Sequence, residues 1–191
     1  VPQERICEIL IEQAKLGRRV VRLKGGDSFI FGRGGEEVEA VRAAGIEAHV
    51  TPGISAALAA GAQAQIPLTH RDAAQAVTFV TGRPKLGGPD LDYAALAAST
   101  HTLVVYMGVA VAATLSRRLV EAGRSPATPV GIIENASLST ERRVFTTLDA
   151  LAHTISSEKL SGPAVLVIGE VVARAPGHLA SLSLQALEHA A

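Results

Sequence analysis

Short apolar segments alternate with segments of helical periodicity along most of the chain, and this alternation constrains the fold more than any other feature. The apolar runs "RRVVRLK" (18–24) and "IEAHVT" (46–51) are each followed, after a loop, by residues with helical spacing. Such alternation is typical of α/β proteins, in which helices connect parallel strands and the loops after the strands gather at one edge of the sheet. Because ligands bind at that edge, the residues that follow each strand are the first candidates for a site.

Two lobes are predicted, with a boundary near residues 72–76. Residues 1–75 form an N-terminal α/β lobe with a mostly parallel sheet that lacks its first strand, and residues 76–191 form a C-terminal α/β lobe. Helices are expected at 1–17, 35–45 and 55–62 in the first lobe. In the second lobe, "LSTERRVFTTL" has the character of a hairpin strand rather than a helical crossover, which favours a mixed sheet. The last residues, 181–191, are expected to form a helix.

Composition excludes several classes of partner. Eighteen basic residues balance eighteen acidic ones, so no net field directs the chain toward nucleic acid or a membrane surface, and neither is expected as a partner. The longest strongly apolar stretch, residues 102–115, is shorter than a bilayer span. The single cysteine, Cys7, makes a reducing cytoplasm the default location, and a buried structural thiol is favoured there over a nucleophile. Histidines are scattered without ligand spacing, so no metal is expected.

The stretch "RLKGGDSFIFGRGGEE" (22–37) is the most informative local feature. Gly25 and Gly26 end an apolar run without Cβ atoms, so a ligand can lie directly against the backbone there. Asp27 adds an acceptor that suits hydroxyls or an amine rather than a phosphate. Neither the G-x-G-x-x-G pattern nor a P-loop is present. The alternative interpretation is an ordinary turn into a helix with an Asp or Ser N-cap.

The second half of this stretch places Arg33 and Glu36 three residues apart near a helix start. Arg33 can bind a carboxylate through two hydrogen bonds, which makes it a candidate for an anionic substrate. The alternative is a solvated salt bridge within the first turn of the helix.

Further candidates follow other strands. Ser55 and Ala56 come after the turn "TPGIS", Arg71 lies in "PLTHRD" at the lobe junction, and Met107 ends the strand "TLVVYMG". Each has an alternative: plain turn chemistry, an interlobe salt bridge and a core residue, respectively. A cleft between two lobes, floored by glycines and rimmed by arginines, accounts for these positions together. Two further strand ends belong to the same pattern: Glu134, Asn135, Ala136, Gly162 and Pro163.

Several of these segments occur together in one known family. The segments "VVRLKGGDSFIFGRGGEE", "VTPGIS", "IPLTHRD", "VTG", "VYMG" and "ENAS" occur in the order and nearly the wording found in uroporphyrinogen-III C-methyltransferases, which the chain resembles from residue 1 to about residue 175. The resemblance implies a two-lobed homodimer that methylates a tetrapyrrole at two ring carbons with S-adenosylmethionine. The products would be precorrin-2 and S-adenosylhomocysteine, for siroheme, cobalamin or heme d1 synthesis.

The resemblance also implies roles for particular residues. Those expected to contact the methyl donor are Gly25, Gly26, Asp27, Ile30, Ser55, Ala56, Met107 and Ala136. Those expected to meet the tetrapyrrole are Arg33, Glu36 and Arg71, the arginines through its carboxylates, with Glu36 also a candidate base for removal of a ring proton. Alternatives remain: a methyltransferase for a later corrin precursor, or a fragment that binds ligand and dimerises without catalysis.

Three departures from the family pattern are evident. The family usually has proline at the position of Ser28 and glycine at the position of Ala136. Its N-terminal strand, with a glycine- and proline-rich loop and an acid and a lysine proposed for proton transfer, would precede residue 1. The chain is therefore expected to be a truncated member or the ordered part of a longer one.

Overall fold

The computed structural model describes residues 1–83 and 87–178. Its chain separates into two compact units, Val1–Ser55 and Ala56–Ala191. The predicted lobe boundary at residue 75 stays a prediction; by contacts, the helix that begins at Ala56 belongs to the second unit.

The first unit contains two helices that pack against each other, α1 (Gln3–Lys15) and α2 (Gly34–Ala43). Pro2 stands at the N-cap of α1, where its fixed φ suits a helix start and its missing N–H costs nothing. Gly17 and Gly45 follow the two helix ends with φ of 74° and 76°, the left-handed conformation that glycine adopts without a Cβ penalty. Both helices therefore begin and end close to the predicted positions. Cys7, expected to be buried, is half-buried on α1.

The strands predicted at 18–24 and 46–51 are wrong. Both segments run without helix or strand, and the first unit, all of whose residues are described, contains no sheet. A strand requires a hydrogen-bonded neighbour, and the backbone hydrogen bonds of the described residues do not join these two segments. The two segments contain the expected apolar residues, but the pairing that would make them strands is not present.

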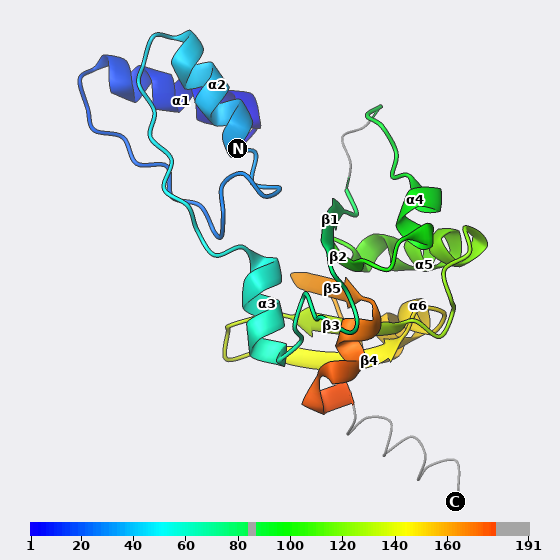
Figure 1. Ribbon diagram of the computed structural model, residues 1–191. Coiled ribbons are helices and arrows are strands. Elements are labelled where there is room, and N and C mark those ends of the chain that lie inside the picture. The colour runs from blue at the N-terminus through cyan, green and yellow to red at the C-terminus, as the bar shows by residue number, and fades with distance from the viewer. Residues whose placement is uncertain (84–86, 179–191) are drawn as a thin grey trace, which may run out of the picture. The chain divides into compact units, whose positions relative to one another are not determined.

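The second unit is built on one five-stranded sheet (Figure 1). Its strands lie in the order β1-β2-β5-β3-β4, with β1 and β2 parallel and every other neighbouring pair antiparallel. The bounds are β1 (Val77–Thr81), β2 (Thr102–Tyr106), β3 (Pro129–Glu134), β4 (Arg142–Thr147) and β5 (Ala164–Ile168). The mixed α/β sheet and the antiparallel partner at 142–147 are thus confirmed.

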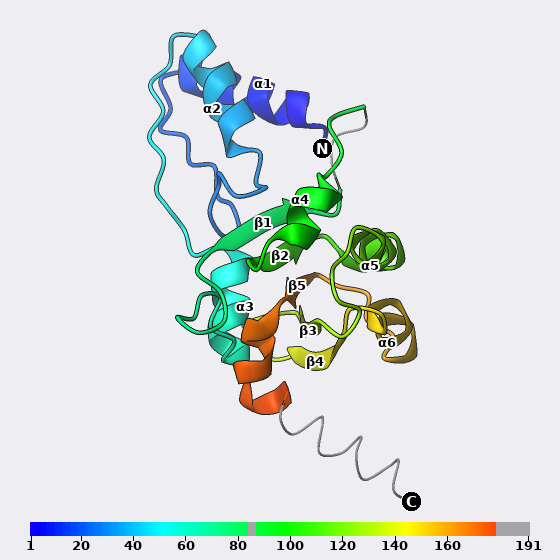
Figure 2. The same cartoon turned by 45° about the vertical axis from the view of Figure 1, so that its right-hand side comes forward.

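Helices cover both faces of this sheet. On one face, α4 (Tyr93–Ala98), α5 (Ala112–Glu121) and α6 (Leu151–Ser157) pack against inward residues of the strands, among them Leu103 and Leu166. On the other face, α3 (Ala56–Ala64) and the 3-10 helix η2 (Glu170–Arg174) pack against Val104 and Val167. Figure 2 shows α3 on one side of the sheet and α5 and α6 on the other. A second 3-10 helix, η1 (Val109–Val111), precedes α5.

The sheet topology places three strand ends at one edge. Since β2 and β3 are both antiparallel to β5, they run in the same direction, and β1 is parallel to β2. The carboxyl ends of β1, β2 and β3 and the start of β5 therefore share an edge. This edge carries the loops that the sequence singled out in the second lobe.

Two further expectations concern the chain as a whole. No helix among the described residues is long and apolar enough to cross a membrane. The helix expected at 181–191 lies outside the described residues.

Candidate functional site

The glycine turn of the first unit is anchored by Asp27. One carboxylate oxygen of Asp27 accepts a hydrogen bond from the Phe29 backbone N–H at 2.9 Å, and the other accepts one from Gly53 N–H at 3.2 Å. Gly53 must be a glycine, because a Cβ there would lie 2.5 Å from the Gly26 carbonyl oxygen. The structure therefore joins two predicted loops, "KGGD" and "TPGIS", through one carboxylate.

Gly25 differs from Gly53 in what surrounds it. A Cβ built on Gly25 would meet no atom within 4 Å, and Gly26, with a φ of 80°, holds the left-handed conformation of the turn. The backbone at Gly25 is therefore open, whereas the glycine at position 53 serves internal packing. Ile30, a further predicted donor contact, is half-buried beside this turn.

The loop into α2 is packed around the backbone of Ser28. The Ser28 carbonyl accepts a hydrogen bond from Gly34 N–H at 2.9 Å, and a Cβ at Gly32 or Gly34 would lie within 2.7 Å of that oxygen. The Ser28 hydroxyl is buried and has no hydrogen-bond partner among the described residues. A serine at this position thus leaves a buried polar atom unpaired.

Arg33 and Glu36 bind each other at the start of α2. The Arg33 guanidinium donates from Nε at 2.9 Å and from Nη2 at 2.5 Å to the two oxygens of the Glu36 carboxylate. Both side chains are about half exposed. The structure thus shows the salt-bridged first turn, and the same fork geometry is the one that Arg33 would use on a substrate carboxylate.

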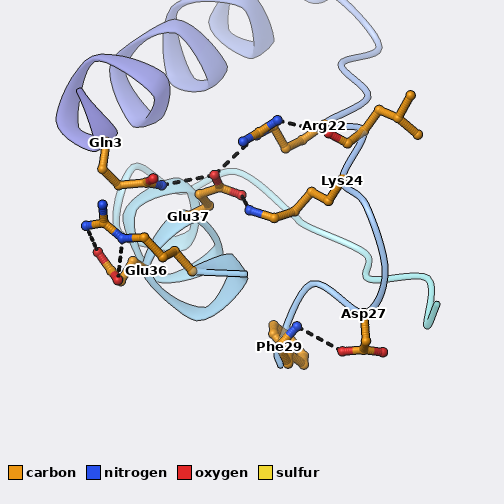
Figure 3. A network of polar contacts seen from close by, with 9 residues as sticks. Gln3, Arg22, Lys24, Asp27, Phe29, Glu36 and Glu37 are labelled. Carbon is orange, nitrogen blue, oxygen red and sulfur yellow. Dashed lines mark hydrogen bonds and ion pairs between the residues drawn. The ribbon is translucent and has the colours of Figure 1, made fainter. Parts of the chain in front are cut away.

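Glu37 was not singled out from the sequence, yet it is the centre of the polar network in this unit. Its oxygens accept hydrogen bonds from Gln3 at 2.9 Å, from Arg22 at 3.2 Å and from Lys24 at 2.9 Å, as Figure 3 shows. The Glu37 side chain is 6% exposed. The available signal was the pair Arg22 and Lys24, two residues apart and so on one side of an extended chain, before a helix whose first turn is acidic.

The electrostatics of Glu37 favour the carboxylate. Burial raises the pKa of Glu37, but the hydrogen bonds that it accepts, first among them the one from Lys24, outweigh burial and leave the pKa below its ordinary value. The network links α1, α2 and the segment that leads into Gly25. The network therefore holds in place the segment that leads into the glycine turn.

In the second unit, the start of α3 is attached to the end of β2. The Ala57 backbone N–H donates to the phenol oxygen of Tyr106 at 3.0 Å. Ala56 is the first residue of α3, and Met107 follows Tyr106 directly, so this bond joins the neighbours of two predicted donor contacts. Ser55, which precedes α3, is buried.

The turn after β2 has a fixed backbone. Met107 has a φ of 54° and its side chain is exposed. A Cβ at Gly82 would lie 2.6 Å from the Met107 carbonyl oxygen, and a Cβ at Gly108 would lie 2.7 Å from Leu166 Cδ1. Glycines at positions 82 and 108 thus permit the close packing that holds Met107 in a left-handed conformation. Met107 is not the core residue of the alternative interpretation.

The turn after β3 is fixed by a buried carboxylate. Glu134 accepts hydrogen bonds from Ser161 N–H at 2.8 Å and Gly162 N–H at 2.9 Å, and Asn135 N–H donates to the Pro163 carbonyl at 2.9 Å. The Gly162 bond is the main cause of a Glu134 pKa below its ordinary value, and burial opposes it. Ala136 follows directly and is half-buried against the α3 side of the core.

Arg71 is placed differently from Arg33. It is exposed in the loop 69–72, next to the bridge between His70 and Ala74, and it forms no ion pair among the described residues. Elsewhere in the described part of the chain, no three or more His, Cys, Asp or Glu residues form a group that could hold a metal ion.

Fold and loops together define an α/β protein whose candidate site residues lie on glycine-rich loops and strand ends. The family model of tetrapyrrole (corrin/porphyrin) methylases matches residues 1–152. The chain is 50% identical over 172 residues to siroheme synthase from Azotobacter vinelandii, covering 90% of this chain but 37% of that protein. It therefore spans little more than a third of the curated relative that it matches.

Solved structures of similar fold are also tetrapyrrole methyltransferases. The uroporphyrin-III C-methyltransferase from Thermus thermophilus, complexed with S-adenosylhomocysteine, superposes with a TM-score of 0.79 and 39% identity over 89% of this chain and 74% of that one. A cobalt precorrin-4 methyltransferase shares the fold, with a TM-score of 0.82 at 22% identity over 90% of this chain and 72% of that one. The chain belongs to the tetrapyrrole methylase family, and the resemblance found from its motifs is confirmed.

Proposed function

We propose that this chain is the methyl-transferring part of an enzyme that methylates uroporphyrinogen III at two ring carbons with S-adenosylmethionine. The products would be precorrin-2 and S-adenosylhomocysteine. The observation that carries the proposal is the likeness to the Thermus enzyme, whose structure holds S-adenosylhomocysteine. The siroheme synthase relatives favour siroheme as the use of the product.

The residues present fit a methyl donor. Two groups of contacts are proposed, one in each unit. In the first unit, the open backbone at Gly25 and Gly26 leaves room for a ligand, and each Asp27 oxygen retains a lone pair beyond the N–H bond that it accepts. Ile30 and Ser55 are the other donor contacts proposed in the first unit.

Three donor contacts are proposed in the second unit: Ala56, the exposed Met107 and Ala136.

Arg33, Glu36 and Arg71 are proposed to meet the tetrapyrrole. Uroporphyrinogen carries acetate and propionate arms, and guanidinium groups bind carboxylates through paired hydrogen bonds. Arg71 can do so without losing an ion pair seen among the described residues, whereas Arg33 must exchange Glu36 for the substrate. This exchange would take one cation away from the Glu36 carboxylate, and a carboxylate with one cation fewer beside it accepts a proton more readily, which supports Glu36 as the proposed proton acceptor.

The proposed reaction mainly requires that the ring carbon and the methyl group of the donor be aligned. A pyrrole ring carbon forms a bond to the methyl carbon as the methyl–sulfur bond breaks, the sulfonium becomes a neutral thioether, and a ring proton then passes to a base. The ring carbon is itself electron-rich, so the protein's residues chiefly hold the two partners in line.

A cytoplasmic homodimer without a resident metal is proposed as the working state.

The test uses the full-length protein that contains this chain, incubated with uroporphyrinogen III and S-adenosylmethionine and analysed by mass spectrometry. Addition of two methyl groups per tetrapyrrole supports the proposal. A full-length protein that binds S-adenosylhomocysteine in calorimetry but transfers no methyl group would contradict it and favour a ligand-binding function. Methylation of a later corrin precursor in preference to uroporphyrinogen III would contradict the substrate but not the reaction.

A further inference from the structure

The position of α3 in the second unit depends on few contacts. Its sequence, AALAAGAQA, is nearly all small residues, and Ala57, Ala60 and Ala64 form its buried face against the sheet. Alanine favours the helix, but a row of methyl groups buries little area and does not interlock with a neighbour as larger side chains do. Packing alone therefore fixes the helix weakly along its own axis.

The two ends of α3 are held in different ways. At the C-terminal end, Ile66 is 2% exposed, and its backbone N–H donates to the Gly61 carbonyl at 2.8 Å. At the N-terminal end, Ala57 N–H donates a hydrogen bond to the Tyr106 phenol oxygen. Ala57 is fully buried, so without Tyr106 this N–H would be one of the unpaired donors at a helix start.

Tyr106 is itself well fixed. It is the last residue of β2, its ring packs edge-on against Phe79 at a centroid distance of 6.1 Å, and its carbonyl accepts a hydrogen bond from Gly82 N–H at 2.7 Å. The residue after it is Met107, whose carbonyl packs closely against Gly82 and which Gly108 follows. The phenol oxygen is therefore a fixed point from which the start of α3 is set.

We propose that Tyr106 is a positioning residue for the methyl donor: its hydroxyl sets the distance between Ala56 at the start of α3 and Met107 directly after β2. The inference rests on the proposed function, because it assigns both residues to donor binding. Tyr106 acts through the backbone of α3 and needs no contact with the donor. Loss of the hydroxyl frees the N-terminal end of α3 and loosens the donor-binding geometry more than the fold.

The test compares Tyr106→Phe with Tyr93→Phe in the full-length protein. Tyr93 is the other tyrosine of this chain; its ring lies under the Arg118 guanidinium at 3.9 Å on the opposite, α4–α5 side of the sheet, so the control removes the same hydroxyl away from α3. Calorimetry with S-adenosylhomocysteine is expected to show about three- to tenfold weaker binding for Tyr106→Phe, the usual effect of one hydrogen bond. Tyr93→Phe is expected to bind as the unchanged protein does.

Two further readouts separate positioning from general destabilisation. Hydrogen exchange at the Ala57 amide is expected to accelerate in Tyr106→Phe, while exchange at Leu166 in the sheet centre stays unchanged. In steady-state methyl transfer, the effect is expected mainly in the KM for S-adenosylmethionine.

The outcomes distinguish a failure of the proposed function from a failure of the role of Tyr106. If the unchanged protein fails to bind S-adenosylhomocysteine, the proposed function is wrong and the role of Tyr106 falls with it. If the unchanged protein binds and Tyr106→Phe binds equally well, the role of Tyr106 is wrong and the proposed function stands. Equal weakening in Tyr106→Phe and Tyr93→Phe also overturns the positioning role.

Discussion

The two units of this protein are stabilised by different kinds of contact. In the first unit, Val41 is the sole buried apolar residue of the fully described residues 1–55, and the buried Glu37 carboxylate joins three segments. In the second unit, both faces of a five-stranded sheet are covered by buried aliphatic side chains. The first unit therefore depends on hydrogen bonds and charge, and the second on hydrophobic burial.

The largest expected effect is in the second unit. Leu166 is fully buried at the centre of β5. Leu166→Ala removes aliphatic volume that the surrounding core cannot refill, and we expect the free energy of unfolding of this unit to fall by about 2–5 kcal/mol. Chemical denaturation followed by circular dichroism measures it, with the exposed Leu138→Ala as the control that should change little.

The next effect is in the first unit and concerns two adjacent glutamates. Glu37→Ala leaves Lys24, 13% exposed, without its carboxylate, and we expect a loss of about 2–3 kcal/mol in the local stability of α2. Glu36→Ala removes an exposed pair and should cost less than about 1 kcal/mol. Hydrogen exchange at α2 amides gives both values, and equal losses would show that the Glu37 network is not what holds this unit.

Two glycines of the first unit differ in what an added methyl group would meet. Gly53→Ala places a Cβ 2.5 Å from the Gly26 carbonyl, so we expect a loss of about 1–3 kcal/mol in the first unit, whereas Gly25→Ala meets nothing and should leave its stability unchanged. Gly25→Ala should instead weaken the binding of S-adenosylhomocysteine while the variant remains fully stable. Tight binding by Gly25→Ala would remove Gly25 from the proposed donor contacts.

The smallest effect is a dependence on pH. The folded pKa of Glu37 lies below its ordinary value of 4.5, so its stabilising contribution is complete above pH 4.5 and is lost as the pH falls through the folded pKa. The exchange protection of α2 should thus decrease below about pH 4.5, and Glu37→Gln should flatten that decrease. An unchanged decrease in Glu37→Gln would assign it to other carboxylates. Glu134 and Glu141 have lowered pKa values for a different main reason, bonds from backbone N–H groups, and make the second unit respond in the same direction.

The same contrast explains what the sequence could predict. Helix limits followed from Pro2, Gly17 and Gly45, because caps are local. The sheet of the second unit followed from long apolar runs that pair with one another. The segments 18–24 and 46–51 were predicted as strands from the same apolar character. Whether a segment finds a hydrogen-bonded neighbour depends on the rest of the fold, which its own sequence does not specify.

The candidate site shows a similar division. Asp27, Arg33 and Met107 were proposed from motifs, because glycine-rich spacing and, for Met107, the position after a strand are visible in sequence. Glu37 and Tyr106 were missed as organising residues. Their partners lie 13 to 34 residues away for Glu37 and 49 residues away for Tyr106, so only the fold brings them together.

The two anchors of Asp27 have a consequence for the order in which the first unit assembles. The Phe29 bond is local and can form as soon as the turn leaves the ribosome, but the Gly53 bond closes a loop of 26 residues that contains all of α2. Loop closure of this length takes well under a millisecond, far less than synthesis of the intervening residues. The glycine turn therefore acquires its second anchor only after the chain has been made through Gly53, and a ribosome-bound chain shorter than this carries the turn with its local anchor alone.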